Sequence, residues 1–135
     1  MTVKDRYTGI QDLFKVVGSD GCLFLSLCSI IEEVNGQPVD IIDVLKTSID
    51  NKWIDEKMFV LDSLALLGHW TNKKWARKEV ASLGIIHDND YTIAKWYNSR
   101  TGFTHFRRRG WDTLVNSQTV KQGKLKGYYI YTYEV

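Results

Sequence analysis

Apolar residues surround almost the whole of one predicted helix near the start of the chain. They are Leu23, Phe24, Leu25, Leu27, Ile30 and Ile31. A helix that is apolar on all sides lies in the interior of a domain. Ser19 or Asp20 can accept hydrogen bonds from the first-turn amides, and Asn35-Gly36 ends the periodic segment. The pattern predicts a capped, central helix over residues 22–34.

Three further segments carry helical spacing. Ile41, Ile42, Leu45 and Ile49 predict a helix over 39–49, with Asp40 near its positive end. A third helix is predicted over 55–67, with Gly68 as its stop. The segment 74–83 is compatible with a short helix closed by Gly84, although Trp70 and Trp75 leave a strand interpretation open there.

From Tyr91 onward the pattern becomes aromatic and β-branched, which is typical of strands. Strands are predicted over 91–97, 102–106, 111–115 and 128–133. Turn-forming residues separate them at 98–102, 108–110 and 122–123. Helices followed by antiparallel strands are the order of an α+β fold.

The composition is that of one ordinary domain. The chain has 135 residues, 44% of them hydrophobic, and a single proline. Nothing in it resembles a linker or a repeat, so we expect one domain over 1–135. The polar start lacks the apolar run of a secretory signal, and no apolar stretch is long enough to cross a bilayer. We therefore expect a cytoplasmic protein with no membrane partner.

Charge and cysteine content narrow the function classes. The net charge of +2 does not by itself indicate a nucleic-acid partner. The cluster Arg107-Arg108-Arg109 and the basic run 73–78 are interpreted as solvated turn and helix surface.

Cys22 and Cys28 would lie ~9 Å apart along one helix, too far for a disulfide. Without paired Cys or His spacings, we expect no metal site and no cofactor.

Cys22 is the first candidate for chemistry. A thiol in the first turn of a helix meets the partial positive charge of backbone amides, which favours the nucleophilic thiolate. The alternative interpretation is a small buried hydrophobe, and this second interpretation is the one we apply to Cys28.

His105 is the candidate base, and Asp112 the group that orients it. If 102–107 and 110–115 form a hairpin around Arg108-Arg109, then His105 lies directly opposite Asp112. Opposed residues have Cβ atoms about 5 Å apart on one face, within reach of a hydrogen bond. A three-residue loop would instead leave Asp112 diagonal to His105.

The motifs around Cys22, His105 and Asp112 together resemble those of a known enzyme family. Asp20-Gly21-Cys22 opening an apolar helix, Thr104-His105-Phe106 on a later strand and Trp111-Asp112-Thr113-Leu114 resemble papain-like cysteine peptidases. The most similar branch comprises bacteriocin-leader-cleaving peptidases and small relatives in phages and spirochaetes. The resemblance implies a papain-like α+β fold, in which a buried Cys-bearing helix packs on a C-terminal antiparallel sheet. It also implies a Cys22–His105–Asp112 triad acting on a peptide or protein substrate.

Two departures from the family pattern keep alternatives open. Val16 stands where these enzymes carry an oxyanion-stabilising Gln, which leaves Gln11, Ser19 or the Cys22 amide as candidates. Thr113 stands where a Pro is usual, and Asn116 is a rival orienting residue, because papain uses an amide in that role. A papain-like binding module without turnover, such as a phage-encoded inhibitor or adaptor, is therefore the alternative function.

Nucleic-acid binding is a third hypothesis. It would use Arg107, Arg108 and Arg109 as phosphate contacts. The stacking surfaces would be Trp96, Tyr97 and Trp111. The sequence does not indicate an oligomeric state.

Overall fold

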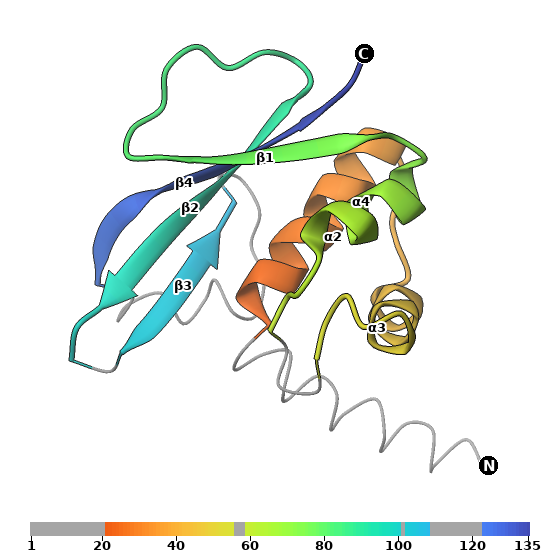
Figure 1. Cartoon of the computed structure of the whole chain (residues 1–135), viewed down its shortest axis with the longest axis horizontal. Coiled ribbons are helices and arrows are strands. Elements are labelled where there is room, and N and C mark those ends of the chain that lie inside the picture. The colour runs from red at the N-terminus through yellow and green to blue at the C-terminus, as the bar shows by residue number, and fades with distance from the viewer. Residues whose placement is uncertain (1–20, 56–58, 101, 109–122) are drawn as a thin grey trace.

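The computed structural model describes residues 21–55, 59–100, 102–108 and 123–135 (Figure 1). Within them the elements follow one another as α2 (Cys22–Asn35), α3 (Ile41–Asp50), α4 (Ser63–Thr71), β1 (Trp75–Val80), β2 (Asp90–Asn98), β3 (Phe103–Arg107) and β4 (Lys124–Tyr133). The strands form one antiparallel sheet in the order β1-β4-β2-β3, and the helices pack on it. The predicted α+β order is confirmed.

Helix α2 lies at the centre of the core, as its pattern predicts. Phe24, Leu27, Ile30 and Ile31 are fully buried, and the helix packs against both α4 and β3. Gly36 ends it in the left-handed conformation, where its amide donates to the Glu32 carbonyl. Gly21 occupies the N-cap position and has no side chain to accept from the first-turn amides. The predicted caps Ser19 and Asp20 lie outside the described residues.

Helix α3 begins two residues later than its periodicity predicts. Asp40 is its N-cap: the carboxylate accepts from the amides of Ile42 and Asp43 at 3.0 and 3.3 Å. This capping bond fixes the boundary, because the N-cap residue itself is not helical. Val44 and Leu45 bury the apolar face of α3 in the core.

The prediction of a third helix over 55–67 is wrong at both ends. The Asp62 carboxylate accepts from the Ala65 amide at 3.0 Å and starts α4 there. Before it, the amides of Leu61 and Asp62 donate to the Trp53 carbonyl, and residues 59–62 are not helical. Gly68 lies inside α4 and does not stop it. A Cβ at Gly68 would meet the Lys73 carbonyl at 3.2 Å, so glycine fits a close backbone approach.

The segment 74–83 is a strand over part of its length, so the helix prediction there is wrong. Residues Trp75–Val80 pair with β4 from Tyr133 to Tyr128. The Trp75 indole is buried and donates to the Thr71 hydroxyl at 2.8 Å, which joins β1 to α4. Pairing with a strand some fifty residues later decides this conformation, and a local pattern does not contain that information.

The faces of the sheet follow from its register. Tyr91 pairs with Tyr131 and Ile93 with Tyr129, and directly opposed residues share a face. The Tyr131 hydroxyl donates to Ser63 of α4 at 3.0 Å, which identifies this face as the one toward the helices. In Figure 1 the helices lie beside one part of the sheet, and the β2–β3 turn projects away from them.

The remaining strand predictions are confirmed where the structure describes them. β2 covers the predicted 91–97, and β3 begins and ends one residue later than the predicted 102–106. The two strands are joined by a turn in which Gly102 donates to the Asn98 carbonyl at 2.8 Å. β4 covers 128–133 and begins four residues earlier. The predicted strand over 111–115 lies outside the described residues. None of the helices in the described ranges has the length and apolar character needed to span a membrane.

Candidate functional site

Cys22 is the first residue of α2, where the backbone amides of the first turn favour a thiolate. Gly21 precedes it as N-cap, so no side chain of the cap residue competes for the first-turn amides. The Cys22 sulfur lies 4.0 Å from the backbone carbonyl oxygen of Thr104 on β3. The thiol is therefore held between a helix N-terminus and the strand that carries His105. Its side chain is only 4% exposed.

Cys28 lies deeper in the same helix and is 3% exposed. Burial, with a smaller contribution from Glu32, raises the pKa of its thiol far above the ordinary value. Neither cysteine is in a disulfide. The interpretation of Cys28 as an inert core residue fits these surroundings, and it provides an internal comparison for Cys22.

His105 lies in the middle of β3 and is 2% exposed. Burial lowers the pKa of its imidazole from the ordinary value near 6.5, and the nearby Arg107 guanidinium lowers it further. The imidazole is therefore neutral at neutral pH. A neutral imidazole is the protonation state that a general base requires.

The alternation along β3 determines how His105 stands relative to α2. Phe106 packs against the core, with its ring centroid 5.3 Å from that of Tyr129. His105 is opposed to Trp96 in the register with β2. Because successive side chains leave a strand on opposite faces, His105 leaves β3 on the side away from Phe106. The structure thus brings the backbone of β3 to Cys22, with His105 directed toward the other face.

The other predicted site residues lie outside the described residues. These are Asp112, the rival orienting residue Asn116, and the oxyanion candidates Gln11 and Ser19. The pairing of His105 with Asp112 therefore stays a prediction.

Arg108 was interpreted as solvated turn surface, and this interpretation is wrong. Its side chain is buried, and it donates to the Ser29 hydroxyl at 3.1 Å and pairs with the Glu33 carboxylate, both on α2. A buried guanidinium requires such partners, because desolvation without them is costly. Glu33 gives no sequence signal for this role, since acidic residues near a helix end are usually solvated.

The basic run 73–78 was also interpreted as turn and helix surface. Its residues lie instead on β1 and in the two positions just before it. The Lys73 ammonium lies 4.5 Å from the ring centroid of Tyr133, and the Arg77 guanidinium lies 4.6 Å from that of Tyr129. Lys74 forms an exposed ion pair with Glu134. These cations lie over aromatic rings, which the local sequence pattern does not indicate.

Metal-ligand side chains do not converge within the described ranges: no three His, Cys, Asp or Glu residues there are placed to hold an ion. Comparison with known proteins gave no matching family model, and no curated protein or solved structure with significant similarity.

Proposed function

We propose that the chain is a papain-like cysteine hydrolase that cleaves a peptide or related amide, with Cys22 as nucleophile. The observation that carries the proposal is the placement of Cys22 at the N-terminus of a central helix, with its sulfur 4.0 Å from the backbone of the His105-bearing strand. Helix N-terminal amides stabilise a thiolate. A cysteine helix that precedes a sheet carrying the histidine is also the element order expected of a papain-like domain.

The proposed reaction begins when the Cys22 sulfur attacks the substrate carbonyl carbon and His105 takes the thiol proton. The C–N bond then breaks, and His105 returns the proton to the leaving amine, which leaves an acyl thioester on Cys22. Water attacks the thioester in the second half, and the sulfur departs with a proton. The low pKa of His105 keeps its acceptor nitrogen available for the first step.

The proposal also assigns a residue that orients His105 and a donor that stabilises the oxyanion. Asp112 would accept from the imidazole and stabilise its charged form during reaction, with Asn116 as the alternative. The Cys22 amide, Ser19 or Gln11 would donate to the oxyanion in place of the missing Gln. The imidazole leaves β3 on the face away from Phe106, and β3 is the edge strand of the described sheet. The chemistry therefore requires the imidazole to turn past this edge and come within about 4 Å of the Cys22 sulfur.

A pair of cysteine variants tests the proposal. A fluorogenic peptide library incubated with the protein should show hydrolysis that Cys22→Ala abolishes and Cys28→Ala retains, because both cysteines lie buried on one helix and only Cys22 is at its N-terminus. Circular dichroism should show that both variants are folded. Hydrolysis that persists in a folded Cys22→Ala protein would contradict the assignment of the nucleophile.

A binding module without turnover, on the same papain-like fold, is the second candidate function. Two observations favour it: Cys22 and His105 are both almost fully buried, and the alternation of β3 directs His105 away from the core-facing side. Such a module could act as a phage-encoded inhibitor or adaptor of a protein partner. Full biological activity in a folded Cys22→Ala protein would support it, and loss of that activity would exclude it.

A further inference from the structure

Charge is divided between the two halves of the structure, although the net charge is small. The described helical part, from Gly21 to Asn72, carries two Lys and seven Asp or Glu residues. The described sheet part, from Lys73 onward, carries ten Lys or Arg and four Asp or Glu residues. A separation of this kind gives the sheet half a positive field that attracts polyanions and leaves the helical half repulsive to them.

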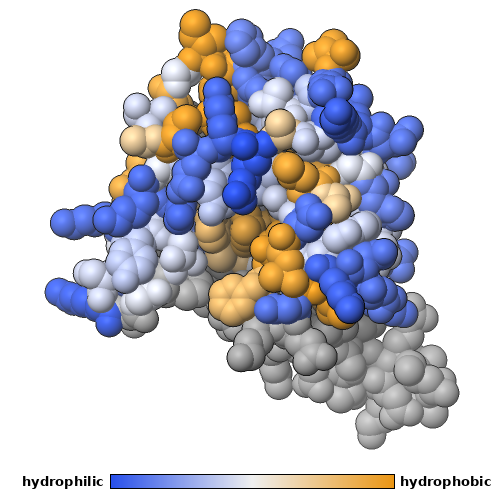
Figure 2. Space-filling view, viewed as in Figure 1, coloured by the Kyte–Doolittle hydropathy of each residue, from blue (hydrophilic) through white to orange (hydrophobic). Residues whose placement is uncertain are grey.

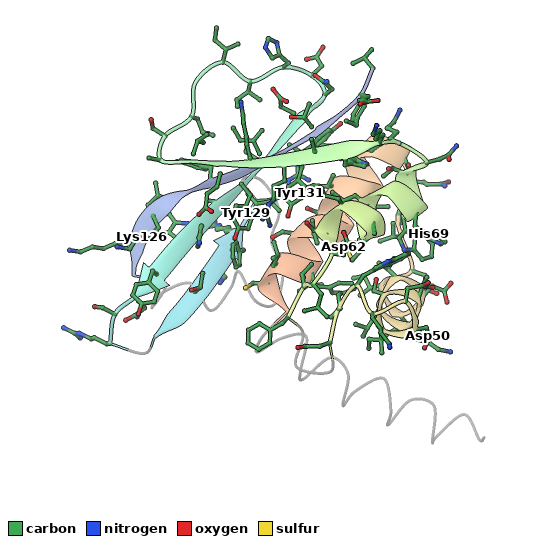
Figure 3. All side chains as sticks on the ribbon, in the orientation of Figure 1. Asp50, Asp62, His69, Lys126, Tyr129 and Tyr131 are labelled. Carbon is green, nitrogen blue, oxygen red and sulfur yellow. The ribbon has the colours of Figure 1, made fainter. Side chains whose placement is uncertain are left out.

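An exposed aromatic ring lies among these cations at the end of the sheet that is far from the helices. Tyr97 of β2 is 38% exposed, and the Lys126 ammonium lies 5.8 Å from its ring centroid. Tyr97 is opposed to Lys124 at the start of β4, and exposed Arg100 follows in the β2–β3 turn. Figure 3 shows Lys126 extending outward from this end, and Figure 2 shows strongly hydrophilic side chains projecting from the same side.

The backbone holds this end of the sheet in place. Gly123 has a φ of +87°, and a Cβ built there would lie 2.1 Å from the Tyr97 carbonyl oxygen. β4 therefore enters the sheet in close backbone contact with the end of β2. Lys124, Lys126 and Tyr97 are consequently presented by paired strands, which limits the ordering cost of binding.

A second aromatic and cationic group continues along the helix-facing side of the sheet. Tyr129 has the Arg77 guanidinium 4.6 Å and the Lys95 ammonium 5.5 Å from its ring centroid. Lys95 is paired with Glu79 at 3.1 Å, so Arg77 supplies the positive charge here. The cation at Tyr129 therefore adds to the positive charge of this part of the sheet.

We propose that this end of the sheet binds single-stranded nucleic acid, with a base stacked on Tyr97 and phosphates contacted by Lys124, Lys126 and Arg100. Cations alone would serve any polyanion, but an exposed ring between them adds a surface for a base, which every single strand offers and a duplex hides. Of the surface expected from the sequence, the proposal keeps Tyr97. Arg108 is bound to Glu33, and Arg109 and Trp111 lie outside the described residues.

Fluorescence anisotropy with labelled oligomers of dT and rU, about 12 nucleotides long, tests the proposal at about 50 mM salt. We expect a dissociation constant on the order of micromolar, and a logarithmic salt slope of about −2 for three phosphate contacts. Lys126→Glu should weaken binding at least about fivefold and make the slope shallower. Tyr97→Ala should weaken binding about fivefold or more while Tyr97→Phe retains it, because the ring does the stacking.

Lys46→Glu is the matched control, since Lys46 is exposed on α3 and the substitution changes the net charge equally. Binding in Lys46→Glu should stay within about twofold of the original. The absence of binding to either oligomer, or equal losses in Lys46→Glu and Lys126→Glu, would overturn the proposal. Equal affinity for a duplex, or equal competition by polyglutamate, would also overturn it, in favour of a general polyanion or an acidic protein partner.

Discussion

The Arg108 guanidinium donates to the Ser29 hydroxyl at 3.1 Å and so attaches the end of β3 to the middle of α2. The same guanidinium pairs with the Glu33 carboxylate one turn further along the helix. These contacts fix the strand that carries His105 against the helix that carries Cys22. They connect the stability of the fold with the geometry of the candidate site.

Replacement of Arg108 should therefore destabilise the fold. We expect Arg108→Met to lower the free energy of unfolding by about 2 kcal/mol, less than for a fully buried pair because the Glu33 side chain is 47% exposed. Urea denaturation measures the change. A double-mutant cycle with Glu33→Gln should give a coupling energy of about 1 kcal/mol. Strict additivity of the two substitutions would show that the pair does not contribute.

The contrast between α2 and Arg108 shows what the sequence could predict. The apolar residues of α2 interact within one helix and with the core around it, so their spacing identified the element. The partners of Arg108 lie more than seventy residues earlier, and no local pattern contains such a contact. β1 depends in the same way on its pairing with β4.

The error at α4 has a local cause. Both Asp55 and Asp62 are plausible N-caps, and the apolar spacing after each of them is helical. In the structure Asp62 caps the helix, whereas the Asp55 carboxylate accepts from the Phe59 amide, and neither of these two residues is helical. Of the candidate site, the sequence correctly placed Cys22 at a helix start and His105 on a strand. The face on which His105 leaves β3 depends on the register with β2 and needed the structure.

The low pKa of His105 predicts how stability depends on pH. Below the ordinary pKa near 6.5 the unfolded chain binds a proton at this residue that the folded protein resists. Stability should therefore fall as the pH decreases from about 7.5 to about 5. His105→Gln should make this fall less steep, as measured by urea denaturation across the range. An unchanged slope in His105→Gln would contradict the assignment.

Alanine substitutions at two glycines with positive φ should distinguish the cost of backbone strain from the cost of steric overlap. Gly36 has a φ of +70° with open space around it, whereas a Cβ at Gly123 would lie 2.1 Å from the Tyr97 carbonyl oxygen. Gly36→Ala should cost about 1 kcal/mol of unfolding free energy, from backbone strain alone. Gly123→Ala should cost ~3 kcal/mol or more, because the backbones of β2 and β4 must also separate. Equal costs in thermal or urea unfolding would show that the strands do not approach this closely.

The pH dependence of Cys22 alkylation tests the account most directly. The protein is treated with iodoacetamide across about pH 5 to 9, and modification of each cysteine is followed by peptide mass spectrometry. Burial limits the rate at Cys22, which is 4% exposed, but the helix N-terminal amides beside it predict that this rate already reaches its plateau near neutral pH. Cys28, whose pKa burial raises, should stay unreactive in the folded protein. A Cys22 rate that rises only above about pH 8.5, as for an ordinary thiol, would contradict the proposed nucleophile.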